Sequence, residues 1–225
     1  MKILRVEELT KVFGSGELAV TAPEDISFSV QSGQMMALLG PSGSGKTTLL
    51  LCISLILEPT RGIIVINSQD IFRHGWTGID LRRFRREHIG FVFQGQNLIP
   101  FLTARENIEL PMYLTGASQR VRRPRAEELL QYLEIGHRSR ALPALLSGGE
   151  QQRVAIGRAL TNCPPLILAD EFPRPNGTAG GVAPGTRPAA ALARRTDVPR
   201  LLGLPDDTEA VHLFRGVRGV DRMTA

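Results

Sequence analysis

A glycine-rich octet set between two apolar runs constrains the fold of this chain more than any other feature. Residues 40–47 read Gly-Pro-Ser-Gly-Ser-Gly-Lys-Thr and fit the pattern G-x-x-x-x-G-K-[ST] at every position. The run 35–39 before the octet has the composition of a buried strand, and 48–51 after it begins like an apolar helix. Because a phosphate-binding loop of this kind joins a strand to a helix, the sequence predicts an α/β fold with a strand over 35–39 and a helix over 46–57.

The octet has the chemistry of a nucleotide phosphate site. Its glycines allow the backbone to bend closely round an anion, and successive N–H groups then face the negative charge together with the helix N-terminus. Lys46 is placed to reach the β- and γ-phosphates, and Thr47 to offer its hydroxyl to Mg²⁺. The alternative is a plain Gly/Ser turn before an ordinary helix, which the flanking apolar runs disfavour. The candidate nucleotide-binding residues here are Gly40, Pro41, Ser42, Gly43, Ser44, Gly45, Lys46, Thr47 and Thr48.

A second candidate element is the apolar run 166–169, which ends in Asp170 and Glu171. An acid at the carboxyl end of a buried strand can hold Mg²⁺ through its water shell. A second acid beside it can act as a general base on an attacking water. Apolar runs that end in acids are common, so this element gains its meaning from its pairing with the octet at 40–47.

A third element spans residues 146–153 and reads Leu-Ser-Gly-Gly-Glu-Gln-Gln-Arg. Its glycines again free backbone N–H groups at the start of a predicted helix, which indicates a second anion site in the same chain. For Ser147-Gly148-Gly149 alone, a serine N-cap before a glycine-containing turn is the simpler interpretation. The whole octet, placed shortly before the acid-tipped strand, favours the anion site.

Composition narrows the remaining possibilities. The 225 residues suffice for one large α/β domain with a subdomain. The formal charge of +5 comes from arginines that are spread along the chain, so we expect no nucleic-acid partner. Cys52 and Cys163 predict buried free thiols in a reducing compartment. The first residues include acids where a signal peptide is apolar, and the longest apolar run, 49–57, is too short to span a bilayer. We therefore expect a soluble, cytoplasmic chain.

Periodicity predicts the order of the other elements. The segment 26–30 alternates with period two, as an antiparallel strand with one wet face does. From 103 to 146 the pattern is helical without a convincing strand, which predicts a helical subdomain at about 100–146 inserted into the α/β body. Further strands are expected over 2–7, 63–66 and 89–93, and an exposed basic helix over 79–88.

The segment 172–225 differs in character from the rest of the chain. It is rich in Pro, Gly, Ala and Arg, contains no lysine, and has no run of β-branched residues suited to a central strand. We expect 172 to about 200 to be irregular, and 207–215 to form at most one short amphipathic element.

The three motifs, in the order and spacing in which they occur along the chain, resemble those of ATP-binding-cassette (ABC) ATPases, the nucleotide-binding subunits of ABC transporters. Residues 40–47 resemble the family's phosphate loop, Gln94 its glutamine loop, 146–153 its signature and 166–171 its Walker B strand. The segments most similar to the macrolide-exporter and lipoprotein-release branch are 18–22, 89–94, 97–100 and 150–156. The resemblance covers residues 1 to about 171, and it implies a P-loop NTPase core with an antiparallel β subdomain and an inserted α-helical subdomain.

The resemblance also implies roles for single residues. Phe13 corresponds to an aromatic residue that stacks on adenine, although a lone phenylalanine near a turn is more often part of a core. Thr47, Gln94 and Asp170 would form the Mg²⁺ site, and Gln94 would also sense the γ-phosphate. Glu171 would be the catalytic base. The residues that would contact the ATP held by a second copy are Ser147, Gly148, Gly149 and Glu150.

The resemblance further implies an assembly. A site built from two chains implies a head-to-tail homodimer that closes on two ATP molecules, with ATP and Mg²⁺ as the cofactors. The helical stretch 100–146 would dock on transmembrane subunits and pass the closure to them, which would hold the chain at the inner face of the cell membrane.

The resemblance ends abruptly after Glu171. Where the family continues with Pro-Thr-Gly-Asn-Leu-Asp, the D-loop, residues 172–177 read Phe-Pro-Arg-Pro-Asn-Gly. About thirty residues later the family has a switch histidine, whereas 194–203 contains none and His212 follows no adequate strand. We hypothesise a change of reading frame near residue 172, an idea that fails if the other two frames of the gene encode no D-loop and no Thr-His-Asp.

The sequence leaves three functional hypotheses. The first is the ATPase subunit of an ABC exporter or lipoprotein-release system that works through separate membrane subunits. The second is a nucleotide-binding remnant that no longer hydrolyses ATP, because the D-loop and switch histidine are missing. The third is a soluble ABC-type ATPase in another role, such as cell division.

Overall fold

The computed structural model describes residues 2–41, 43–93, 97–170 and 190–193. Three predicted site residues, Ser42, Gln94 and Glu171, lie outside the described residues, as does His212. The division of the chain at residue 171 into a nucleotide-binding domain and an atypical segment therefore stays a prediction.

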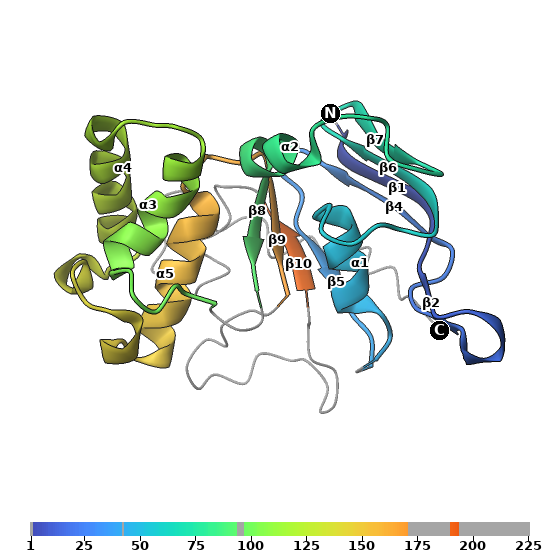
Figure 1. Cartoon of the computed structure of the whole chain (residues 1–225), viewed down its shortest axis with the longest axis horizontal. Helices are drawn as coiled ribbons and strands as arrows, with labels where there is room; N and C mark the ends of the chain where they lie inside the picture. Colours follow the sequence, from blue (N-terminus) through green and yellow to red (C-terminus); the bar gives the residue numbers. More distant parts are fainter. Residues whose placement is uncertain (1, 42, 94–96, 171–189, 194–225) are drawn as a thin grey trace.

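One half of the molecule is an antiparallel sheet with the strand order β4-β1-β6-β7 (Figure 1). Along β1, Leu4, Val6 and Leu9 are buried, whereas Arg5 and Glu7 form an ion pair on the opposite face. This alternation is what a sheet with one wet face requires, and it confirms the predicted antiparallel β subdomain. The four strands are β1 (Lys2–Thr10), β4 (Ile26–Gln31), β6 (Arg61–Ile66) and β7 (Gln69–Arg73).

Strand β7 follows β6 directly and is not among the strands predicted from the sequence. Asn67 and Ser68 have φ angles of +51° and +63°, and Ile66 pairs with Gln69, so these two residues form a two-residue hairpin turn. The strand was missed because it opens with the polar residues Gln69 and Asp70, which hide its apolar pair at 71–72. A smaller hairpin of β2 (Val12–Phe13) and β3 (Val20–Thr21) encloses η1 (Gly16–Leu18).

The second sheet has the strand order β5-β10-β9-β8. The strands β8 and β9 run parallel, and all four residues of β9 are buried, as in a sheet covered on both faces. The bounds are β5 (Met36–Leu38), β8 (Ile89–Val92), β9 (Leu166–Ala169) and β10 (Ala190–Ala193).

The strand β10 corrects the expectation that 172–225 adds no central strand. It pairs with β5 on one side and with β9 on the other, antiparallel to both. The expectation was wrong because it rested on the lack of β-branched residues, whereas two open strand edges offer backbone donors and acceptors that any residue other than proline can satisfy.

Two further helices lie beside the sheets: α1 (Lys46–Ile53) and α2 (Leu81–His88). Helix α1 ends earlier than the predicted 46–57. Ser54 is its C-cap, its hydroxyl donates to the Leu51 carbonyl at 3.0 Å, and Leu55 has a φ of +60°. A left-handed residue cannot continue a right-handed helix, so the apolar run 54–57 forms a turn.

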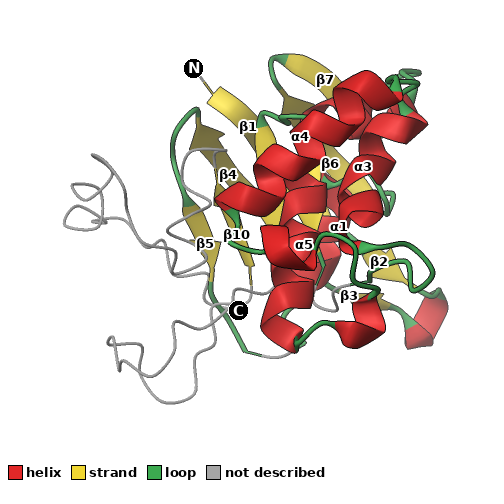
Figure 2. Ribbon diagram, turned by 90° about the vertical axis from the view of Figure 1, so that its left-hand side faces the viewer, coloured by secondary structure: helices red, strands yellow, loops and turns green. Residues whose placement is uncertain are grey.

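The other half of the molecule is helical (Figure 1), and Figure 2 views the molecule from this helical side. It consists of α3 (Ala104–Leu114), α4 (Gln119–Tyr132), η2 (Gly136–Arg138), η3 (Pro143–Leu145) and α5 (Gly148–Leu160). Helices α3 and α5 cross closely at Gly157, where an added Cβ would lie 2.7 Å from Cδ1 of Ile108. This half agrees with the helical pattern predicted for 103–146, to which α5 adds the helix that begins at the signature.

Strand β9 separates two hydrophobic cores. Leu166 and Leu168 belong to the core that contains α1 and the antiparallel sheet, while Ile167 and Ala169 belong to the core of α3, α4 and α5. Because side chains of a strand alternate between faces, α1 and α5 pack on opposite sides of β9. The C-terminal end of β9 therefore lies where the two halves of the molecule meet.

Both cysteines are free thiols, as predicted, but only Cys52 is buried. Burial raises the pKa of the Cys52 thiol to about 11, and the nearby Lys11 partly opposes that rise. Cys163 is exposed, which corrects the expectation of burial, since it follows the last turn of α5 with a φ of +53°.

In the part of the chain that the structure describes, no helix has both the length and the apolar character needed to cross a membrane.

Candidate functional site

The phosphate loop follows β5 and leads into α1, as predicted. Gly43 and Gly45 have φ angles of +84° and +83°, a region that favours glycine. At Gly45 an added Cβ would also lie 3.0–3.2 Å from atoms of Ala22 and Pro23, so the turn at 22–23 closes tightly over the loop. The glycine positions in the octet are thus fixed by backbone conformation and by a close approach.

The N-terminus of α1 is built to face an anion. Gly45 is the N-cap, and no side-chain hydrogen bond caps the helix among the residues that the structure describes. The first intrahelical bond runs from the N–H of Leu49 to the carbonyl of Gly45 at 2.8 Å. The preceding N–H groups of the first turn have no intrahelical acceptor, and together with the helix dipole they favour negative charge.

Lys46 folds back over the loop that precedes it. Its ammonium donates to the carbonyl oxygens of Gly40, at 2.9 Å, and of Pro41, and to the Ser44 hydroxyl at 3.2 Å. The positive charge of Lys46 is thereby held against the backbone of the loop. A phosphate oxygen would accept from this ammonium more strongly than a carbonyl does.

The phosphate loop meets the acid-tipped strand through one direct hydrogen bond. The Thr47 hydroxyl donates to Oδ1 of Asp170 at 3.0 Å, although the two residues are 123 positions apart. Asp170 is only 7% exposed, and its N–H donates to the Val92 carbonyl at 3.0 Å, which continues the parallel pairing past the end of β9. The structure therefore brings together two of the three predicted metal residues.

The donor chemistry at this point fits Mg²⁺. A threonine hydroxyl and a carboxylate are both hard oxygen donors, and Mg²⁺ binds through one or two such groups together with water and phosphate. No cluster of three or more His, Cys, Asp or Glu side chains suited to a metal occurs in the described parts of the chain.

The signature element forms the start of α5. Ser147 is the N-cap and makes a full capping box with Glu150, whose carboxylate accepts from the Ser147 N–H at 2.7 Å and from its hydroxyl at 2.9 Å. These two hydrogen bonds and the charge of Arg138 lower the pKa of the Glu150 carboxyl, against a smaller opposing effect of burial. The serine N-cap interpretation is thus correct locally, and it leaves Gly148 and Gly149 exposed with open space where a Cβ would be.

Arg138 is a supporting residue that sequence reasoning missed. Its Nε donates to Oε1 of Glu150 at 3.0 Å, and its Nη2 donates to the Leu145 carbonyl. It fixes the start of α5 from η2. Arg138 and Glu150 lie in different elements, so no helical or strand periodicity in the sequence could have indicated their contact.

Phe13 lies on the β2-β3 hairpin, where it pairs with Val20. Its side chain is 42% exposed, and the ammonium of Lys11 lies 5.3 Å from the centre of its ring. Exposure makes one ring face available for stacking, so a core role does not describe this residue. Its contact with adenine stays a prediction.

A hollow of about 250 Å³ lies elsewhere, on the antiparallel sheet. Its lining includes Glu7, Glu8, Ser27 and His74, and none of the predicted site residues. It plays no part in the phosphate site.

Comparison with known proteins agrees with this geometry. Residues 23–173 match the family described as ABC transporter. An uncharacterized ABC transporter ATP-binding protein of Thermotoga maritima is 45% identical over 170 residues, which are 76% of this chain and 72% of that protein. The macrolide export ATP-binding/permease protein MacB of Marinobacter nauticus is 43% identical over 169 residues, which are 75% of this chain and 26% of that protein.

A solved structure shows the same similarity in three dimensions. It is described as the "Dimeric structure of a post-hydrolysis state of the ATP-binding cassette MJ0796 bound to ADP and Pi". The TM-score is 0.68 and the sequence identity 41%, over 75% of this chain and 73% of that one. The likeness confirms the predicted fold class.

Proposed function

Since this chain belongs to the ABC transporter family and carries that family's ATP-binding domain, we propose that it binds and hydrolyses Mg-ATP and so powers transport through separate membrane subunits. The observation that carries the proposal is the 3.0 Å hydrogen bond between Thr47 and Asp170. It joins the phosphate loop to the end of β9, where the reacting groups of a phosphate-transfer site belong.

In this proposal the loop holds the triphosphate. The backbone N–H groups of the loop and of the first turn of α1 face the phosphate oxygens, and Lys46 exchanges its carbonyl partners for the β- and γ-phosphates. Thr48 follows in the first turn of α1, and Phe13 stacks on the base. These contacts position the nucleotide, which is most of what phosphoryl transfer asks of a protein.

Thr47 and Asp170 are the described residues that would hold Mg²⁺, and Gln94 would add an amide oxygen. The cation would neutralise phosphate charge as it develops. Glu171 follows Asp170 directly and would accept the proton of the attacking water as general base.

The proposed functional unit is a head-to-tail dimer. Helices α1 and α5 pack on opposite faces of β9, so one sheet separates the phosphate loop of a chain from its own signature. The exposed N-terminus of α5, with Gly148 and Gly149, would instead face the γ-phosphate in a second copy. The similar solved structure is that of a dimeric ATP-binding cassette, which supports this arrangement.

The proposed transport role is export or lipoprotein release at the inner face of the cell membrane. The similarity to a macrolide export ATP-binding/permease protein supports that branch. The helical half, including about 100–146, would meet the membrane subunits. The division at residue 171 is part of the same proposal.

A second candidate function is nucleotide binding without hydrolysis. The sequence 172–177 lacks the D-loop pattern, and β10 runs antiparallel to β5 and β9. Its first residue, Ala190, pairs with Leu38 at the phosphate-loop edge, so the chain after Ala193 leaves from the opposite edge. A strand in this direction cannot present the residue after it to the γ-phosphate by a short connection.

Turnover of Mg-ATP by the purified chain, beside a Glu171→Gln variant, separates the two candidates. The proposal expects turnover that falls by about a hundredfold or more in the variant, as loss of a general base does. ATP binding without turnover in either chain would favour the second candidate, and absence of ATP binding would contradict both. Lys46→Ala is the control for binding at the phosphate loop.

A further inference from the structure

Lysine is rare in this protein, and one of its lysines lies over the aromatic ring that the proposed function places at the nucleobase. The chain has three lysines, Lys2, Lys11 and Lys46, and arginine supplies its other permanent positive charges. Lys46 belongs to the phosphate loop. Lys11 is beside Phe13 and has no role in the proposed function as stated above.

The side chain of Lys11 forms a cation–π contact with Phe13. Its ammonium lies over the ring, 5.3 Å from the ring centre, within the ~6 Å at which a positive charge is attracted to an aromatic face. Phe13 is 42% exposed, so burial alone leaves its ring partly free to move. The contact with Lys11 therefore restricts the orientation of this ring.

The backbone of Lys11 is fixed to the turn that closes over the phosphate loop. Its N–H donates to the Pro23 carbonyl at 2.9 Å, and its carbonyl accepts from the N–H of Ala22 at 2.9 Å. The same two residues approach Gly45, where an added Cβ would lie 3.0–3.2 Å from their atoms. The backbone at Lys11 is thus placed relative to the phosphate loop.

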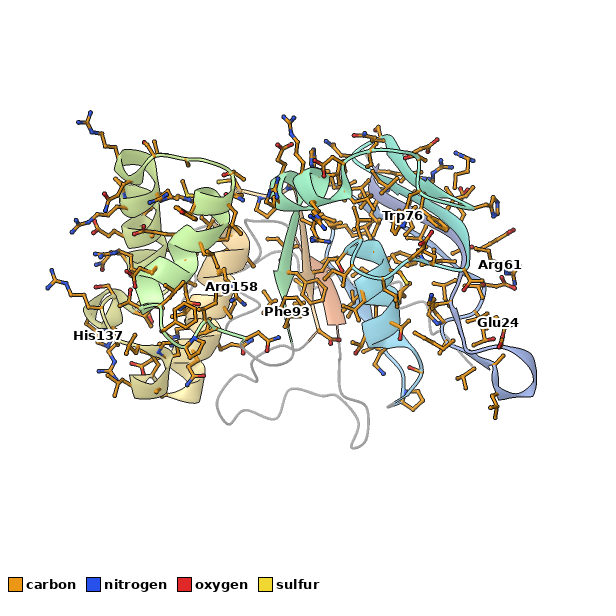
Figure 3. The ribbon with its side chains drawn as sticks, in the orientation of Figure 1. Glu24, Arg61, Trp76, Phe93, His137 and Arg158 are labelled. Atoms are coloured by element: carbon orange, nitrogen blue, oxygen red, sulfur yellow. The ribbon has the colours of Figure 1, made fainter. Side chains whose placement is uncertain are left out.

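A second set of contacts holds this turn from the antiparallel sheet. The hydroxyl of Thr10, a buried residue, accepts from the N–H of Asp25 at 2.9 Å and donates to its carboxylate at 3.1 Å. The same carboxylate forms an ion pair with Arg61 at 2.8 Å. Figure 3 shows Arg61 at the end of the molecule that carries the β2-β3 hairpin. These contacts do not involve the Lys11 ammonium, so a substitution can remove its charge and leave the turn in place.

A cation on one face of an aromatic ring favours a base on the other face. Aromatic rings carry negative charge on both faces, so two rings stacked directly on each other repel at their centres. An ammonium over one face of Phe13 offsets part of that charge. The opposite face, which Lys11 leaves open, is then the better platform for a flat base.

We propose that Lys11 is a positioning residue for the nucleobase, which orients the ring of Phe13 and strengthens its stacking on the base of ATP. The inference rests on the proposed function, because it takes Phe13 as the base contact. Lys11 touches neither the nucleotide nor the reacting atoms in this account, and it acts through the ring. Its effect is therefore confined to ligands that carry a base.

The test compares the affinities of Mg-ADP and magnesium pyrophosphate, both measured by titration calorimetry. Pyrophosphate presents the phosphate chain of ADP without a base, so the ratio of the two affinities isolates the base contact. Neither ligand is a substrate of the proposed ATPase reaction, so the ratio does not depend on turnover.

Six chains are compared: the parent, Lys11→Met, Lys11→Arg, Phe13→Leu, the double variant of Lys11→Met with Phe13→Leu, and Lys2→Met. The last is the matched control, because Lys2 is an exposed lysine at the start of β1 and its substitution removes the same charge. Each chain is first checked for a cooperative thermal melt.

The expected result is a selective loss of affinity for ADP. Lys11→Met weakens ADP binding by about twofold to fivefold, the size of a cation–π contact near the surface, and leaves pyrophosphate binding unchanged. Phe13→Leu weakens ADP binding by about tenfold, as loss of an aromatic–base stack does. In the Phe13→Leu chain the added Lys11→Met has no further effect, because the ring is gone. Lys11→Arg keeps most of the parent's ratio, since a guanidinium also binds an aromatic face.

Four results would overturn the inference: parent-like ADP binding in Lys11→Met, an equal loss for ADP and pyrophosphate, the same loss in Lys2→Met, or a full effect of Lys11→Met in the Phe13→Leu chain. A parent that binds ADP but does not hydrolyse ATP contradicts the proposed hydrolysis alone. A parent that binds ADP no more tightly than pyrophosphate, or binds neither, overturns the base contact and the inference together. If Lys11→Met does not melt cooperatively, Lys11→Gln carries the same comparison.

Discussion

At the scale of single residues, a few buried polar side chains connect neighbouring elements. Asn107 and Thr161 are both buried and both bond to backbone carbonyls of neighbouring elements. Each is satisfied only in one arrangement of the helices around it. Replacement by an apolar residue removes these side-chain hydrogen bonds between elements, which is costly in a core.

Replacing Asn107 by Ala is expected to lower the free energy of unfolding by about 2–3 kcal/mol, because it removes the side-chain partners of the Ile99 N–H and the Leu102 carbonyl. Chemical denaturation measures the change. Asn162→Ala is the control, since Asn162 donates one hydrogen bond, to the Arg86 carbonyl, near the surface. Equal effects of the two substitutions would show that Asn107 is an ordinary polar residue.

Glu150 gives the start of α5 a dependence on pH. Its folded pKa is lowered below the ordinary value of 4.5, chiefly by hydrogen bonds from Ser147. Its stabilising contribution is therefore complete above pH 4.5 and is lost as the pH falls through the lower folded value. Melting curves of the parent and of Glu150→Gln should differ by a constant amount above about pH 5 and converge in acid, because glutamine keeps the capping geometry but does not ionise. A difference that stays constant down to about pH 3 would contradict this.

At the scale of elements, the site depends on how closely β8 and α5 approach. Gly90 of β8 leaves room for α5, since an added Cβ would lie 2.4 Å from the carbonyl oxygen of Ala159 and 3.0 Å from Cγ of Pro164. The obstruction is backbone, which cannot rotate away as a flexible side chain can. This contact sets the distance between the helical half and the strand that leads to Gln94.

Gly90→Ala is therefore expected to destabilise the fold by about 1–3 kcal/mol, as overpacking of a core does. Gly148→Ala is the comparison for stability, because nothing lies within 4 Å of its added Cβ. That variant should change the unfolding free energy by less than about 0.5 kcal/mol. Thermal denaturation of both decides the matter, and a neutral Gly90→Ala would mean that α5 can shift away from β8 at little cost.

At the scale of the whole molecule, β9 is the strand that contacts both hydrophobic cores and the phosphate loop. Its two faces belong to two different cores, and its end carries Asp170 to the phosphate loop. The strand β10 lies between β9 and β5, and it pairs with both over three residue pairs each. The sheet that carries the site is continuous only with that strand in place.

Shortening the chain tests the contribution of β10. A chain ending at residue 189 lacks the strand, and one ending at residue 193 keeps it. The shorter chain is expected to melt at a lower temperature, by several degrees, because the edges of β5 and β9 lose their backbone partners. The chain that ends at residue 189 should also bind ATP more weakly than the chain that ends at residue 193. Identical melting of the two chains would show that β10 adds nothing to the sheet.

Much of this protein was determined by local sequence. The octet at 40–47 required glycines in left-handed conformations between a strand and a helix, and the structure has them at Gly43 and Gly45. Period-two alternation predicted β4, helical spacing predicted the helical half, and Ser147-Gly148-Gly149 offered a serine N-cap as the simpler interpretation. These features depend on neighbours in the chain, so the sequence alone could specify them.

The tertiary structure decided what depends on residues far apart in the chain. It brought Thr47 to Asp170, gave β9 two cores to separate, and placed an alanine-rich strand between β5 and β9 where composition predicted none. It also ended α1 at Ile53, exposed Cys163, and set Arg138 and Arg158 against backbone carbonyls that no periodicity could indicate. Local patterns encode propensity and turn chemistry, whereas pairing partners and close approaches are fixed only when the whole chain packs.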